Sequence, residues 1–153
     1  MQSVQFESLD AVSKRLEQTI KMFPQARREV LEQIGRSALS TVQGNIGGRG
    51  KVQSWQACHI GTGSGYAAVR AKANTYQETK GGKRYAVGYL TNAIENGHSV
   101  RGPGGKAQRY RPRLKKTRVA GKGAYQATER ELERIAVAQA EKLMDRLAGE
   151  MEK

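Results

Sequence analysis

The sequence predicts an α+β fold, with N-terminal helices, a small antiparallel β-sheet that carries a long basic loop, and a C-terminal helix packed on the sheet. Apolar residues at helical spacing are confined to the two ends of the chain. Sixteen of the eighteen glycines lie between Gly44 and Gly123, which favours short strands and turns there. The length of 153 residues fits one domain.

Two helices are expected at the N-terminus. Apolar residues recur every three or four positions across residues 9–22, which is typical of one buried helical face. Pro24 interrupts the pattern, because proline does not continue a helix but suits the first turn of a new one. We therefore expect a second helix from Pro24 to Gln43, with Gly44 as a natural stop.

Short strands joined by glycine-rich turns are expected in the middle of the chain. Residues 61–65 and 80–83 have the composition of hairpin connections. Thr91–Asn96 is expected to form one helical turn closed by Gly97. The expected strands are Lys51–Ile60, Tyr66–Ala73, Tyr76–Thr79 and Arg84–Tyr89.

The C-terminal helix has the clearest start signal. Thr128 and Glu131 fit a capping box, in which each side chain bonds a free backbone N–H at the helix start. Apolar residues at helical spacing follow from Leu132 to Leu147. The predicted single domain, 1–153, thus has four parts: helices in 1–44, a β middle in 45–98, a basic arm in 99–123 and a helix in 128–150.

Positive charge is concentrated in the middle of the chain. Residues 51–128 contain 15 Lys/Arg against two acids, Glu78 and Glu95, and this difference equals the whole net charge of +13. Such segregation favours a polyanionic neighbour, of which nucleic acid is the obvious case. Within 22 residues lie nine cations that we take as candidate partner or DNA contacts: Arg101, Lys106, Arg109, Arg111, Arg113, Lys115, Lys116, Arg118 and Lys122.

No catalytic, cofactor-binding or metal-binding pattern is found. His59 follows Cys58, so in a strand their side chains would point to opposite faces and could not form a nucleophilic pair. With His98 these residues are too few for a zinc site. Glu95 is expected to be a structural salt-bridge partner. We therefore expect a protein that is not an enzyme and has no cofactor.

A single cysteine and the lack of a long apolar run indicate where the chain is made. One cysteine excludes an intramolecular disulfide and suits a reducing compartment. Neither a membrane span nor a secretory signal is recognised. Synthesis in a cytoplasm, with no membrane association, is expected.

Several short motifs occur in the same order as similar motifs in one protein family. Ile94-Glu95-Asn96-Gly97-His98 is followed by Arg109-Tyr110-Arg111-Pro112, Leu114-Lys115-Lys116, a Gly121-Lys122 pair with Tyr125, and Thr128-Glu129-Arg130-Glu131-Leu132. Upstream, Gly50-Lys51-Val52-Gln53-Ser54-Trp55 completes the series. The series is similar to the tail-completion, or head–tail joining, proteins of long-tailed bacteriophages. The family's aromatic–alanine pair has no counterpart at Leu90–Ala93.

The resemblance implies a structural protein of the virion neck. Such a protein would form a homo-oligomeric ring, usually sixfold, between the head-completion (stopper) protein and the tail tube protein, around the DNA channel. Non-specific contact with DNA would explain the positive middle. The apolar content of 37% is low, which also favours self-association.

Two other functions are compatible with parts of the sequence. A free basic nucleic-acid-binding protein, architectural or RNA-associated, would account for the charge, although no known nucleic-acid motif accompanies it. A small basic toxin would need a catalytic constellation that the sequence lacks. The ordered motifs favour the structural ring protein.

Overall fold

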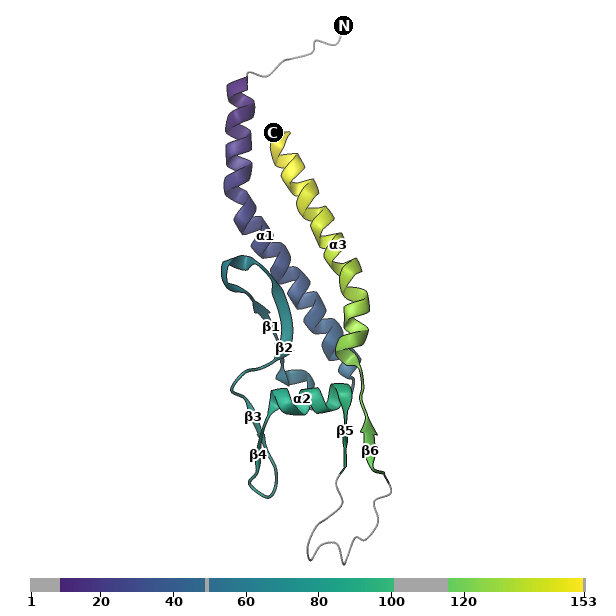
Figure 1. The fold of residues 1–153 in the computed structure, drawn as a ribbon. Helices are drawn as coiled ribbons and strands as arrows, with labels where there is room; N and C mark the ends of the chain where they lie inside the picture. Colours follow the sequence, from purple (N-terminus) through teal and green to yellow (C-terminus); the bar gives the residue numbers. More distant parts are fainter. Residues whose placement is uncertain (1–8, 49, 101–115, 153) are drawn as a thin grey trace, which may run out of the picture. The chain divides into compact units, whose positions relative to one another are not determined.

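A computed structural model describes residues 9–48, 50–100 and 116–152. The α+β class is confirmed: a long N-terminal helix and a C-terminal helix enclose, in sequence, several short strands and one further helix (Figure 1). The contacts divide the chain into two compact units. Unit 1 combines residues 1–38, 58–68 and 131–153, and unit 2 combines residues 39–57 and 69–130.

The N-terminal part is one helix, α1 (Leu9–Ile46), with Pro24 inside it. The prediction of two helices is therefore wrong. Proline removes one backbone N–H from the helical ladder, but the turns on both sides remain bonded. The apolar stripe also keeps its helical phase across Pro24, from Ile20 through Phe23 and Ala26 to Val30. The prediction that this face is buried holds only in part, because Ile20 is 68% and Phe23 43% exposed.

In unit 1, the first 30 residues of α1 and the end of α3 (Ala124–Met151) form a helix pair. Its buried apolar side chains are Ala26, Ala38 and Leu147, of which only Leu147, on α3, is large. Polar contacts supplement this thin core. The Arg146 guanidinium donates to the Glu29 carboxylate at 2.8 Å, and Arg15 donates to the Met151 carbonyl at 2.9 Å.

Within the described residues, six short strands pair as three separate two-stranded sheets rather than as one sheet. The 3₁₀ turn η1 (Gln53–Trp55) precedes the first pair, and η2 (Thr62–Ser64) connects its strands. The two predicted hairpins, around 61–65 and 80–83, are present. The strand pairs are β1 (Gln56–Ile60) with β2 (Ala67–Ala71), β3 (Tyr76–Glu78) with β4 (Arg84–Ala86), and β5 (Gly97–Ser99) with β6 (Arg118–Ala120).

Helix α2 (Val87–Asn96) is longer than the single turn that the sequence predicts. The sequence instead predicts a strand over Arg84–Tyr89, where Tyr85, Val87 and Tyr89 favour strands. Val87 and Thr91 lie one turn apart and are both buried, so this face anchors α2 in unit 2. As predicted, α2 ends at Gly97, whose φ of 77° suits glycine.

The core of unit 2 is a small cluster of apolar side chains. Val42 and Ile46 from the end of α1 contact Ala124 from the start of α3, and all three are at least 95% buried. Val52, Val69 and Tyr125 pack around them. The core thus joins the end of one helix, the start of another and the second strand.

Candidate functional site

The nine predicted cations fall into two groups in the structure. Arg101, Lys106, Arg109, Arg111, Arg113 and Lys115 lie outside the described residues. Lys116 and Arg118 are exposed beside and on β6, and neither makes an ion pair within the described part of the chain. These two are therefore available to an anionic partner.

Lys122 has a structural contact as well as a charge. Its ammonium group donates to the Ile46 carbonyl at 2.9 Å, at the last residue of α1. A cation is favourable there, because the carbonyls of the last helical turn have no partner within the helix and carry partial negative charge. Lys122 therefore fixes the segment before α3 to the end of α1, a role that its place in a basic run did not indicate.

Glu95 supplies the N-cap of α3. Its Oε1 accepts from the backbone N–H groups of Tyr125 at 3.0 Å and Gln126 at 3.1 Å. These donors belong to the first helical turn and have no partner within the helix. Glu95 has a structural role, as expected, but its partners are backbone N–H groups instead of the expected cation.

The capping box predicted at Thr128 is consequently wrong, because α3 starts four residues earlier, at Ala124. Thr128 is buried within the helix and donates to the Ala124 carbonyl at 2.9 Å. The same hydroxyl accepts from the Asn45 side-chain amide at 3.0 Å. A distant carboxylate thus replaces the local cap, and the sequence contains no short-range signal for such a contact.

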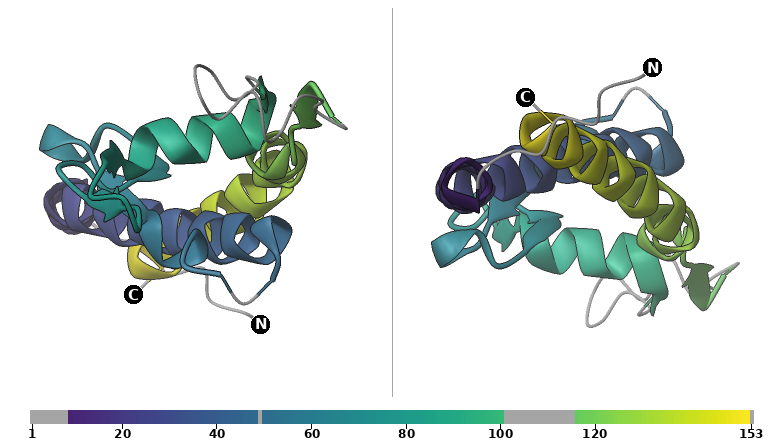
Figure 2. Two further views of the ribbon diagram at one scale, coloured as in Figure 1. Left: turned by 90° about the horizontal axis from the view of Figure 1, so that it is seen from below. Right: turned by 90° about the horizontal axis from the view of Figure 1, so that it is seen from above.

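Two glycines bring the backbones of β5 and β6 unusually close together. A Cβ at Gly97 would collide with the Val119 carbonyl, and a Cβ at Gly121 would collide with the Glu95 carbonyl. β5 and β6 lie side by side (Figures 1 and 2). They pair Gly97 with Ala120 and His98 with Val119. The Lys122 N–H then donates to the Ile94 carbonyl at 2.8 Å. We call Glu95, Gly97, Gly121 and Tyr125 the α2–α3 junction.

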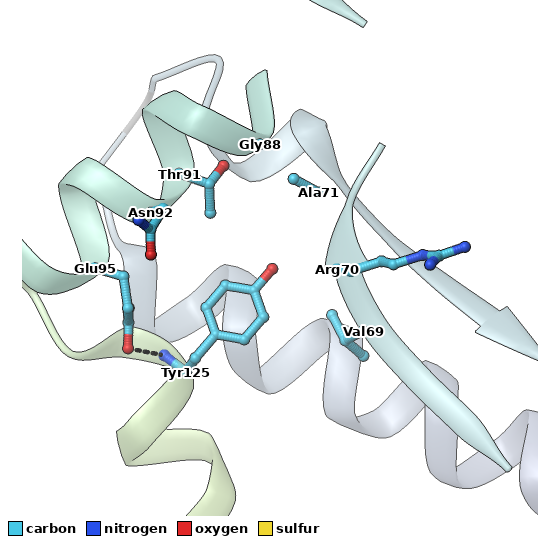
Figure 3. A pocket seen from close by; sticks show the side chains of 8 residues that line it. All are labelled: Val69, Arg70, Ala71, Gly88, Thr91, Asn92, Glu95 and Tyr125. Carbon is cyan, nitrogen blue, oxygen red and sulfur yellow. Dashed lines mark hydrogen bonds between the residues drawn. The ribbon is translucent and has the colours of Figure 1, made fainter. Parts of the chain in front are cut away.

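A cavity of about 370 Å³ lies beside this junction. Figure 3 shows the Tyr125 ring between the α2 residues and the end of β2, with the Arg70 side chain pointing away. The side chains that line the cavity are Val69, Arg70, Ala71, Thr91, Asn92, Glu95 and Tyr125, together with Gly88.

The polar groups around the cavity bond to one another. The Tyr125 hydroxyl donates to the Gln56 side-chain carbonyl, and the Gln56 amide donates to Thr91 at 3.2 Å and to the Val52 carbonyl at 2.9 Å. Among the described residues, no buried side-chain donor or acceptor lacks a partner. These groups therefore hold the junction together.

The pKa of the Tyr125 hydroxyl is raised by burial and, to a smaller extent, by the Glu95 charge. Both causes disfavour the phenolate. The hydroxyl therefore remains a donor to Gln56 at neutral pH, and Tyr125 lacks the lowered pKa that would make it a base. Its ring and hydroxyl both serve packing.

The cysteine and histidines do not form a reactive group. Cys58 is half-buried against Gly35, His59 is exposed near the Tyr66 ring, and His98 is exposed on β5. Burial raises the pKa of the Cys58 thiol, which disfavours the reactive thiolate. In the described ranges, no group of three His, Cys, Asp or Glu side chains is placed to hold a metal ion. No described helix has the length and apolarity needed to span a membrane.

Two exposed aromatic contacts, one on each face of the β3–β4 hairpin, are not among the sequence predictions. Arg84 lies 4.8 Å from the centre of the Tyr76 ring, and Tyr85 stacks on Tyr89 with ring centres 6.4 Å apart. All three tyrosines are exposed, Tyr89 by 66%. Tyrosines at 76, 85 and 89 flank the predicted turn at 80–83, and this is the signal in the sequence that points to them. We call Tyr76, Arg84, Tyr85 and Tyr89 the tyrosine cluster.

The motif residues therefore have identifiable structural tasks. Glu95, Gly97, Gly121 and Tyr125 build the α2–α3 junction, while Lys116, Arg118 and the tyrosine cluster are exposed. Comparison with models of known families, with curated proteins and with solved structures finds no match.

Proposed function

We propose that the chain is a structural virion protein of a long-tailed bacteriophage. It forms a ring, with six copies expected, at the head–tail interface. The ring joins the capsid connector to the tail tube and surrounds the DNA channel. The proposed partners are further copies of the chain, the stopper protein and the tail tube protein.

The observation that carries this proposal is the coincidence between the motif residues and the α2–α3 junction. The Glu-x-Gly motif at Glu95–Gly97 and the later Gly121 with Tyr125 are separated by more than 20 residues in sequence but meet in space. Residues selected for such an architectural contact are expected to recur together within a family of similar folds. Their structural use also supports a role without catalysis.

The charge distribution supports the position around DNA. The described residues of unit 2 include ten Lys/Arg against three acids, Glu78, Glu95 and Glu129. A surface of this kind attracts phosphates without reading bases, which suits DNA that must slide during packaging and ejection. Lys116 and Arg118 are the clearest described candidates for such contacts.

Particle analysis tests the proposal directly. Particles released by cells that encode the chain should contain it in a symmetric set of copies, measured by quantitative mass spectrometry and located at the neck by electron microscopy. Deleting its gene should leave DNA-filled heads and separate tails, and supplying the chain in trans should restore joined particles. Joined, infectious particles from the deletion strain would contradict the proposal.

The excess of cations also favours the alternative, a free basic nucleic-acid-binding protein. The two functions differ in where the protein is found during growth. A ring protein should co-purify with particles after nuclease treatment and a high-salt wash, because its partners are proteins. A free nucleic-acid-binding protein should instead be released by the same treatment, because its binding depends on phosphates and low salt.

A further inference from the structure

The tyrosine cluster is exposed on a hairpin that is small for independent stability. β3 and β4 contribute three residues each, and a two-stranded hairpin is at best marginally stable in water. Tyr76 and Tyr85 lie on opposite faces, since Tyr76 pairs with Ala86 and Tyr85 pairs with Gln77. Both faces thus present an aromatic ring to solvent, which indicates that a partner covers the hairpin.

The chemistry of the cluster favours a protein partner over nucleic acid. Contacts to the phosphates of duplex DNA use cations and give tyrosine rings no partner, whereas tyrosine and arginine are among the side chains most enriched at energetically important protein contacts. One face of the Tyr76 ring is taken by Arg84, and Tyr85 and Tyr89 stack on each other. Lys80 and Lys83 at the turn add positive charge, so the partner surface should be acidic and partly apolar.

Helix α3 carries a surface with these properties. Within unit 1, an exposed stripe at helical spacing contains acidic and apolar side chains and no basic residue. Val137, Met144 and Met151 are 50%, 64% and 44% exposed. Methionine sulfur also makes favourable contacts with aromatic rings. We call this the acidic stripe: Glu133, Val137, Glu141, Met144 and Met151.

We propose that the tyrosine cluster, with Lys80 and Lys83, docks on the acidic stripe of the next copy of the chain. The contact is heterologous: each copy offers its hairpin to one neighbour and its α3 to another, so identical contacts generate a ring when the rotation closes. The closed ring rests on the proposed function, while the pairwise contact rests on these two surfaces.

Zero-length cross-linking identifies the contact even when it is weak. A carbodiimide joins a lysine amine to a carboxylate in direct contact, so unlabelled chain is mixed with chain labelled with heavy nitrogen. We expect mixed-isotope peptides that link Lys80 or Lys83 to Glu133 or Glu141. Links that join only chains of the same isotope, or that join the hairpin to other carboxylates, would overturn the proposal.

Charge reversal tests direction and specificity. The hairpin variant, Lys80→Glu with Lys83→Glu, and the stripe variant, Glu133→Lys with Glu141→Lys, should each self-associate about tenfold or more weakly in sedimentation equilibrium. Mixed together, the two variants can form two contacts of opposite charge. The unchanged hairpin of the stripe variant meets the unchanged stripe of the hairpin variant, and the acidic hairpin of the hairpin variant meets the basic stripe of the stripe variant. The mixture should therefore recover self-association, with the two variants alternating.

A matched control separates this contact from general charge effects. Lys14→Glu with Lys21→Glu makes the same charge change on the exposed side of α1 and should leave association unchanged. Equal loss in the control, or no recovery of association in the mixture while circular dichroism shows folded chains, would refute the contact. If the variants behave as expected but particles lack the chain, the proposed function fails and the contact stands. If particles that contain the hairpin variant still join heads to tails, the contact fails and the proposed function stands.

Discussion

Several side chains in this protein bond backbone groups at helix ends that neighbouring residues in the sequence leave unpaired. Glu95 illustrates this point, because it caps a helix that begins 29 residues later in the chain. Lys122 does the same for the end of α1 through the Ile46 carbonyl. Both side chains are ionic, yet each bonds backbone groups that a helix leaves unpaired.

Changing Glu95 to alanine should lower the free energy of unfolding by about 1 kcal/mol, the usual effect of removing an N-cap. Glu131→Ala should be nearly neutral, because Glu131 lies within α3 and does not cap it. Urea unfolding of the two variants and the wild type checks both values. A larger loss of stability for Glu131→Ala than for Glu95→Ala would show instead that the capping box at Thr128 forms.

Gly35 and Cys58 should be coupled. A Cβ at Gly35 would overlap the Cys58 sulfur, so Gly35→Ala should destabilise the wild type by about 1–3 kcal/mol. In a Cys58→Ala background the space is free, and the same change should stabilise the protein by up to about 1 kcal/mol through helix propensity. A double-mutant cycle measures this coupling, and additive effects would contradict the contact.

At the scale of elements, the sequence predicts whether a segment is a helix or a strand better than it predicts the residues at which each helix or strand begins and ends. The hairpins and the terminal helices follow from local turn chemistry and apolar spacing, which act over a few residues. The start of α3 could not be predicted, because its cap comes from α2. The length of α2 was missed because the burial of Val87 overrides the strand propensity of its neighbours.

The candidate site was predicted only in part. Lys116 and Arg118 are exposed as a contact surface requires, but Lys122 also holds the end of α1. The tyrosine cluster was missed because its members come from two strands and a helix. Their proximity depends on the register of β3 with β4, which the sequence pattern does not specify.

Pro24 provides a test of the continuous helix α1. Proline in a helix interior is about 3 kcal/mol less favourable than alanine, so Pro24→Ala should raise the free energy of unfolding by up to that amount. At the first position of a separate helix, the same change would bring no such gain. Chemical unfolding distinguishes the cases, with Ala26→Gly as a control that should destabilise α1.

For the whole molecule, the distribution of charge matters more than the net value. Under the proposed function, DNA binding should be insensitive to sequence and should weaken steeply with salt. Lys116→Gln with Arg118→Gln should reduce the slope of log K against log salt by about 1.8, the value for two phosphate contacts. Fluorescence anisotropy with unrelated duplexes measures this slope.

Lys122→Gln is the matched comparison for that measurement. Its ammonium donates a hydrogen bond to the Ile46 carbonyl. Removing the charge should therefore lower the free energy of unfolding and leave the slope of log K against log salt nearly unchanged. A change in slope of about 0.9 without loss of stability would show instead that Lys122 contacts phosphate. The two variants together separate cations that bind a partner from one that maintains the fold.

The pairing of β5 with β6 has a practical consequence for engineering. The Val100 N–H donates to the Thr117 carbonyl at 2.9 Å, so the segment between them starts and ends at one place. A short turn such as Asn-Gly can span ends that are this close. The segment can therefore be excised, or exchanged for an affinity tag or an electron-dense label, while the junction stays intact. Such a graft would allow the contribution of its cations to be removed as a unit, and the position of each copy to be marked in intact particles.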